Sequence, residues 1–87
     1  MLYSTSVNDK LQEHDVVALT EDVRTKHFLT QEPLQLRRGQ IGTVVMLLNN
    51  DHFEVEFDDN NGRAYAMLPL AKNQLMLLRE QPEPVSA

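Results

Sequence analysis

The chain has 87 residues and a net charge of −5, which together restrict what it can be. A chain of this length forms one domain with a small core, and its 41% of hydrophobic residues indicates that it folds. Cysteine is absent, which excludes disulfides and thiolate metal sites. Thirteen acidic against eight basic residues disfavour a nucleic-acid partner, because such a chain repels the phosphate backbone on average.

The first strand is expected at residues 15–19, DVVAL, a compact β-rich run between polar residues. Residues 1–12 have no regular hydrophobic period, and we expect them to form an N-terminal arm. They lack the basic start and apolar centre of a secretory signal, and no apolar run approaches the roughly 20 residues of a membrane span. We therefore expect a soluble, cytoplasmic protein.

A long polar stretch follows, from Thr20 to Gln35. We expect a loop here, with at most one turn of helix between Val23 and Leu29, because Pro33 stops anything longer. Loops of about fifteen residues are uncommon in compact domains and are often functional.

Two glycines organise the next segment, residues 36–48. Gly39 suits a turn with positive φ, and Gly42 suits a bulge or a close backbone approach within a strand over residues 40–48. Arg37 and Arg38 come directly before the first glycine, but the segment lacks the Lys-Ser/Thr end and the helix of a phosphate-binding loop. We therefore interpret the glycines as structural.

The clearest alternation in the chain predicts a strand at residues 53–58. Phe53, Val55 and Phe57 alternate there with Glu54 and Glu56, which is typical of a half-buried strand with its acidic side outward. A turn at residues 58–62, a returning strand at 63–69, a tight helical turn within 70–74 and a last strand at 75–79 complete the pattern. Residues 80–87 are polar and contain prolines, and we expect a flexible tail.

Five short strands in this order predict an all-β fold, namely a small five-stranded SH3-like barrel over residues 13–79. The expected barrel has a long loop after its first strand and a short 3-10 turn before its last strand. An OB-type barrel is the alternative, although it would require longer strands and a helix between the third and fourth.

Four sequence blocks together resemble a family of small bacterial proteins of unknown function that is frequent in cyanobacteria. They are DVVALTED at 15–22, RGQIGTVV at 38–45, FEVEF at 53–57 and GRAYA at 62–66, and the similarity covers about residues 14–79. The resemblance implies an SH3-like barrel and no particular activity. The RGxxGxV pattern is also similar to KOW-type barrels and to the small barrel of nitrile hydratase β subunits, as analogies of fold.

The chain shows no residue set that is typical of an enzyme. Its serines lie only in the expected arm and tail, without a base beside them. Glu54 and Glu56 should point the same way about 7 Å apart, but such a pair is more typical of a solvated outer face than of catalysis. Residues 58–62 resemble part of a calcium loop whose first and last ligands would be Phe57 and Leu68, which cannot serve. We expect no enzyme, no metal and no cofactor.

The sequence favours a non-catalytic module that binds another protein, for example an antitoxin- or immunity-like partner of a basic protein. An acidic strand face is complementary to a basic surface, and apolar residues in a polar loop can anchor a partner. The candidate partner-binding residues are Phe28, Leu29, Arg37, Arg38, Glu54, Glu56 and Tyr65. The alternative is an RNA-binding accessory barrel of KOW type, which the acidic neighbours disfavour. A homo-oligomer is compatible with the sequence, and a membrane partner is not expected.

Overall fold

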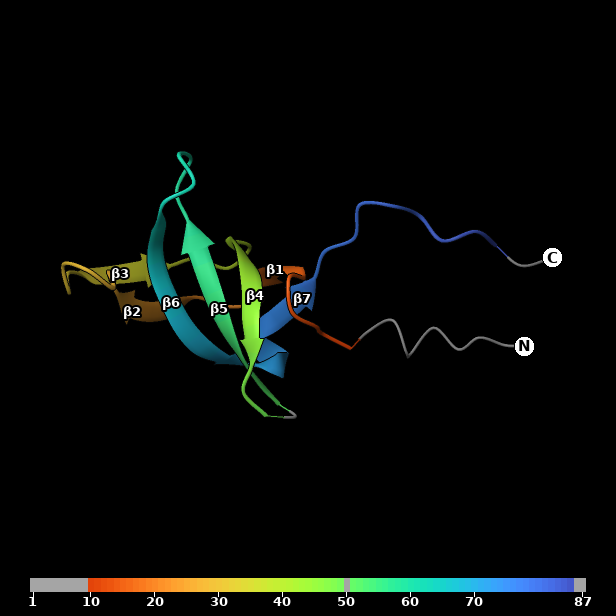
Figure 1. The fold of residues 1–87 in the computed structure, drawn as a ribbon, viewed down its shortest axis with the longest axis horizontal. Helices are drawn as coiled ribbons and strands as arrows, with labels where there is room; N and C mark the ends of the chain where they lie inside the picture. The colour runs from red at the N-terminus through yellow and green to blue at the C-terminus, as the bar shows by residue number, and fades with distance from the viewer. Residues whose placement is uncertain (1–9, 50, 86–87) are drawn as a thin grey trace.

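The computed structural model describes residues 10–49 and 51–85 and shows an all-β protein (Figure 1). Within these residues, seven strands and one three-residue 3-10 turn follow one another. They are β1 Val16–Leu19, β2 Val23–Lys26, β3 Pro33–Leu36, β4 Ile41–Leu47, β5 His52–Asp58, β6 Ala64–Ala71, η2 Lys72–Gln74 and β7 Leu75–Leu77.

Five of these strands form one antiparallel sheet in the order β6-β5-β4-β1-β7. They are the five strands expected from the sequence, with boundaries shifted by at most two residues. The expected 3-10 turn before the last strand is also confirmed. Its first residue, Lys72, donates its backbone N–H to Asp51 O at 2.8 Å and so joins η2 to the β4–β5 turn.

The expected long loop after the first strand is wrong, because this stretch contains a second, two-stranded sheet. β2 and β3 pair antiparallel from Val23↔Leu36 to Lys26↔Pro33, so the helical turn expected after Val23 is wrong as well. Leu36 is fully buried, and Val23 and Leu34 pack against the core. Figure 1 shows the β2–β3 hairpin crossing beside β6, at the end of the molecule opposite to residues 80–85.

The main sheet has an inner face that forms the core and an outer face that is open. The core also contains Leu11, which packs on the sheet from the segment before β1. The buried inner-face side chains are Val17, Leu19, Val44, Phe53, Val55, Phe57, Ala66, Leu70 and Leu75. Phe53, Val55 and Phe57 thus lie inward as their alternation predicts, and this burial is the main stabilising contribution in so small a domain.

The two glycines of residues 36–48 have different roles. Gly39 has φ +91° in the turn after β3, as expected from the sequence. Gly42 instead allows a close approach of β4 to β5, because a Cβ there would lie 2.8 Å from Phe57 Cε2 and 2.8 Å from Val55 Cγ1. The bulge of β4 lies between Val44 and Met46 rather than at the glycine.

The five-stranded count is corrected by the structure, and the two sheets do not close into one hydrogen-bonded barrel. β2 and β3 pair only with each other, while one backbone bond, from Phe28 N to Tyr65 O at 3.1 Å, joins the hairpin loop to the edge strand β6. Within residues 10–49 and 51–85, no helix is long and apolar enough to cross a membrane.

Candidate functional site

The strand pairing places two of the predicted site residues, Glu54 and Glu56, on the outer face of the main sheet. Residues opposite each other in a ladder point to the same side of a sheet. One row across four strands is therefore Val16, Thr43, Glu56 and Met67. A second row is Met46, Glu54 and Pro69, and a third is Ile41, Ala18 and Met76.

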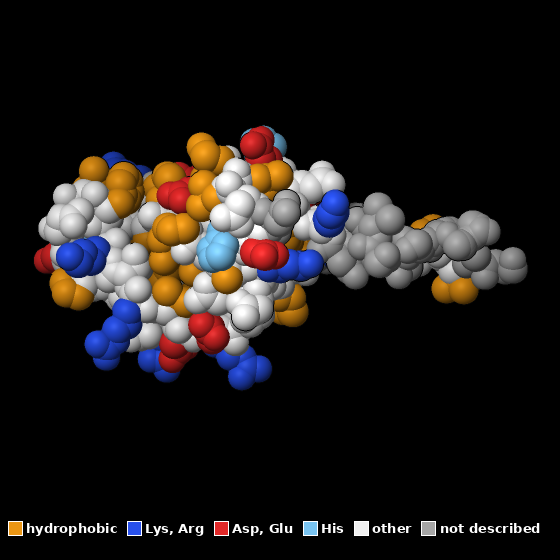
Figure 2. All heavy atoms as spheres, turned by 90° about the horizontal axis from the view of Figure 1, so that it is seen from below, with side chains coloured by type: hydrophobic (Ala, Val, Ile, Leu, Met, Phe, Trp, Pro, Cys, Tyr) orange, Lys and Arg blue, Asp and Glu red, His pale blue; other side chains and the backbone are white. Residues whose placement is uncertain are grey.

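Apolar side chains surround the two glutamates on this outer face. Val16, Ile41, Met46, Met67 and Met76 are 40–57% exposed. Three of the four methionines of the chain are among them, and the fourth is Met1. In Figure 2 hydrophobic side chains reach the surface beside acidic ones at the top of the view, and acidic and basic side chains alternate around the rest of it.

Glu54 and Glu56 are half-buried and have no counterion within residues 10–49 and 51–85. Neither forms an ion pair or a side-chain hydrogen bond with the part of the chain that the structure describes. Each lies next to a methionine across the ladder, Glu54 beside Met46 and Glu56 beside Met67. A cationic side chain arriving from outside would therefore find two acceptors in partly apolar surroundings, where charge attraction is less screened than in water.

Phe28 and Leu29, the predicted anchor, lie in the loop between β2 and β3 and not on the outer face. They are 41% and 73% exposed. The ring of Phe28 stacks on His27 with the centroids 5.8 Å apart. His27 Nδ1 accepts the backbone N–H groups of Leu29 and Thr30 at 3.1 and 3.4 Å, which holds the loop in place.

Arg37, Arg38 and Tyr65 are connected by residues that the sequence did not single out. Arg37 pairs with Asp22 at 3.7 Å, and the Arg38 backbone N–H donates to the same carboxylate at 2.8 Å. Gln40 Oε1 accepts the Arg37 N–H at 3.0 Å, while Gln40 Nε2 donates to the Tyr65 hydroxyl.

The Tyr65 side chain is half-buried rather than freely exposed. Its ring lies 6.5 Å from that of Phe57. This packing and the bond from Gln40 make Tyr65 mainly a structural link between β6 and the turn after β3.

Basic charge is concentrated on the β2–β3 hairpin. Residues 23–38 hold four of the eight basic residues and one of the thirteen acidic residues, a net charge of +3 that leaves −8 for the rest. Arg24 and Lys26 are exposed and share one side of β2. Neither was a predicted site residue, because their grouping with Arg37 and Arg38 depends on the unexpected strand pairing.

The acidic turn at residues 58–62 is a structural turn. Asp59 Oδ1 accepts the backbone N–H groups of Asn61 at 2.8 Å and Arg63 at 3.0 Å, and Gly62 has φ +78°. The hydrogen bonds from Arg63 and then Asn61 lower the pKa of Asp59 below its ordinary value. No group of three or more His, Asp or Glu side chains that could hold a metal ion occurs in the described ranges.

Taken together, these surfaces define a small all-β domain with an acidic, methionine-rich outer face and a basic hairpin. Residues 13–77, about three quarters of the chain, match the family model described as Domain of unknown function (DUF4926). The chain belongs to this family, which agrees with the expectation of an uncharacterised family over about the same residues. Comparisons with curated proteins and with solved structures gave no significant match.

Proposed function

We propose that this chain is a non-catalytic protein-interaction module of SH3-like architecture, which binds a basic segment of another protein on its outer face. The observation that carries the proposal is the pair Glu54 and Glu56, half-buried between exposed methionines without a counterion from residues 10–49 and 51–85. The five expected strands and the hairpin packed beside them support the SH3-like assignment.

The chemistry of the outer face specifies the partner. Lysine or arginine side chains would contact the two carboxylates, which lie about 7 Å apart as alternate residues of a strand. Apolar side chains next to those cations would contact Met46 and Met67, whose flexible thioether side chains adapt to different shapes. A partner segment that alternates basic and apolar residues fits both features. A concrete form is an antitoxin- or immunity-like protein that masks a basic partner.

The test compares two charge reversals of equal size. Tagged full-length protein is incubated with an extract of the source organism, captured proteins are identified, and the affinity for the purified partner is measured by calorimetry. Glu54→Lys with Glu56→Lys should weaken binding by tenfold or more, about 1.4 kcal/mol, because like charges then face each other. Arg24→Glu with Lys26→Glu, on the hairpin, is the control and should leave binding unchanged.

Two results would contradict the proposal. One is capture of a basic partner that survives the outer-face reversal. The other is loss of capture with the hairpin reversal alone.

RNA binding is a second candidate, favoured by the charge separation of the chain. Four exposed cations and the stacked His27–Phe28 pair lie on or beside one hairpin, and cations next to exposed rings suit single-stranded nucleic acid. The same two variants test it, because the hairpin reversal should abolish retardation of a single-stranded RNA at about 50 mM salt and the outer-face reversal should not. No retardation with the unmodified chain would refute this candidate.

A further inference from the structure

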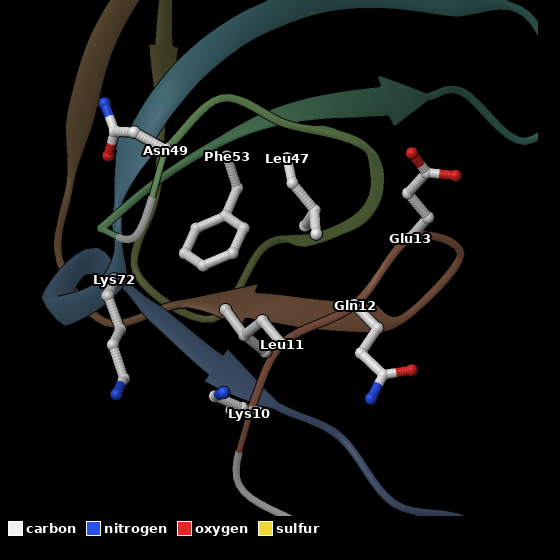
Figure 3. Close-up of a pocket in the computed structure, with 8 residues that line it drawn as sticks. All are labelled: Lys10, Leu11, Gln12, Glu13, Leu47, Asn49, Phe53 and Lys72. Carbon is white, nitrogen blue, oxygen red and sulfur yellow. The ribbon is translucent and has the colours of Figure 1, made fainter.

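We infer that the hollow beside Lys10 and Lys72 is a binding site for an apolar carboxylate, that is, a carboxylate on a short hydrocarbon group. The hollow has a volume of about 570 Å³, within the range of small-molecule sites. It lies where the ends of β4 and β5 meet the segment before β1 and the start of η2 (Figure 3). It is separate from the outer face and from the hairpin.

The floor of the hollow is apolar because Leu11, Leu47 and Phe53 line it at one end of the inner sheet face, where Leu47 is 46% exposed. Leu47 and Phe53 are opposite each other in the β4–β5 ladder and therefore point to the same side. Leu11 approaches them from the segment before β1, and Figure 3 shows the three side chains pointing toward one another. Phe53 and Leu11 are 5% and 8% exposed, so a ligand would meet a well-packed surface.

Two lysines, Lys10 and Lys72, line this hollow beside its apolar floor. Figure 3 shows the side chains of Lys10 and Lys72 ending on the same side of Leu11, whereas Glu13 lies at the far side beyond Gln12. Neither lysine forms an ion pair with the portion of the chain described by the structure. The backbone of Lys72 is held by the bond from its N–H to Asp51 O at 2.8 Å, whereas its side chain is exposed.

This arrangement specifies the ligand class. A carboxylate held by these lysines would gain charge-assisted hydrogen bonds, and its hydrocarbon group would lie against Leu47 over the base formed by Leu11 and Phe53. A cation would be repelled by the lysines, and a strongly hydrated anion would leave the apolar floor unused. A free fatty acid and the C-terminal residue of a polypeptide share this chemistry.

The experiment titrates isotope-labelled full-length protein with two carboxylates and follows the backbone amide signals by NMR. Octanoate represents a fatty acid, and N-acetylleucine represents a polypeptide C-terminus. Octanamide and N-acetylleucinamide are the matched neutral controls. A ligand of about ten heavy atoms should bind with a Kd of about 1 mM, and signals of residues 10–13, 47–49, 53 and 72 should shift.

The charge of the lysines is tested by a pair of double substitutions. Lys10→Gln with Lys72→Gln should weaken carboxylate binding about fivefold, as expected for two exposed charge contacts. The control, Arg24→Gln with Lys26→Gln, removes the same charge from the hairpin and should leave carboxylate binding unchanged. Binding of only one carboxylate, with this dependence, supports the site and identifies the source. Failure of both carboxylates to bind, or equal binding of the amides, overturns the inference. Neither result bears on the outer face, so the proposed function is tested independently.

Discussion

Gly42 offers the sharpest test of how the core of this domain is packed. A methyl group at this position would lie 2.8 Å from Phe57 Cε2, 2.8 Å from Val55 Cγ1 and 3.0 Å from Glu56 O. Phe57 and Val55 are both 0% exposed, so neither side chain can move out of the way into solvent. Gly42→Ala therefore destabilises the fold through steric overlap. It does not act through a positive φ, which is the usual reason for glycine in a turn.

The magnitude follows from two opposing terms. Forcing one methyl group into a filled core destabilises by about 1–3 kcal/mol. Alanine loses less backbone entropy on folding than glycine does, which stabilises the variant by about 0.5–1 kcal/mol. We expect a net loss of about 1–2 kcal/mol, which lowers Tm by roughly 5–15 °C in a domain of this size. Gly42→Val should cost more, because two further methyl groups must fit.

Thermal and urea unfolding measures this effect in four proteins, namely the unmodified chain, Gly42→Ala, Val55→Ala and the double variant. Val55→Ala alone removes a methyl contact and should destabilise, but in the Gly42→Ala background it should cost less, because the added methyl group fills the space left by Val55 Cγ1. The two substitutions should thus show a favourable coupling of about 1 kcal/mol. A Tm within 2 °C of the unmodified chain for Gly42→Ala, or strictly additive effects, would refute this account of the packing.

Two further substitutions test polar contacts. Tyr65→Phe removes the hydroxyl that accepts the partly buried hydrogen bond from Gln40 Nε2, and it should lower the free energy of unfolding by about 1 kcal/mol. The double substitution Tyr65→Phe with Gln40→Met should cost less than the sum of the two single substitutions, because both remove the same bond. Additive losses in urea unfolding would contradict this. Backbone hydrogen bonds hold the pKa of Asp59 in the folded state below its ordinary value. The ionised carboxylate therefore stabilises the fold above about pH 4, which is the ordinary pKa of aspartate in the unfolded chain. This contribution disappears as the pH falls through the lowered pKa of the folded state. Melting curves at several pH values should therefore show a stability advantage over Asp59→Asn at pH 6 that shrinks toward pH 3; an advantage independent of pH would contradict the prediction.

The main strands were predictable because each carries its own signal. Phe53, Val55 and Phe57 alternate with charged residues, and Gly62 marks the turn that follows, so local sequence determines both the strand and its inward side. The 3-10 turn was likewise predictable, because Pro69 and the short polar run at 72–74 leave room for nothing longer.

The β2–β3 hairpin was not predictable because neither its strands nor its loop carry such signals. Each strand has four residues, and β2 carries a single apolar side chain, Val23. The loop places Gln31, not glycine or asparagine, at φ 66°, and uses the His27 side chain to hold its backbone. The burial of Leu36, the packing of Val23 and Leu34 against the core and the backbone bond from Phe28 to β6 select this pairing, and all of them are tertiary interactions.

The bulge at Val45 explains why the candidate surfaces could not be read from alternation alone. In a regular ladder that continues from the Val44↔Val55 pair, Met46 would lie opposite Phe53 and point into the core. The register shift instead places Met46 opposite Glu54, on the outer face, and Leu47 opposite Phe53, on the inner one. One extra residue thus supplies a methionine to the proposed protein-binding face and a leucine to the floor of the proposed carboxylate site. Because bulges insert a residue without a distinctive sequence pattern, both surfaces depend on information that only the strand pairing contains.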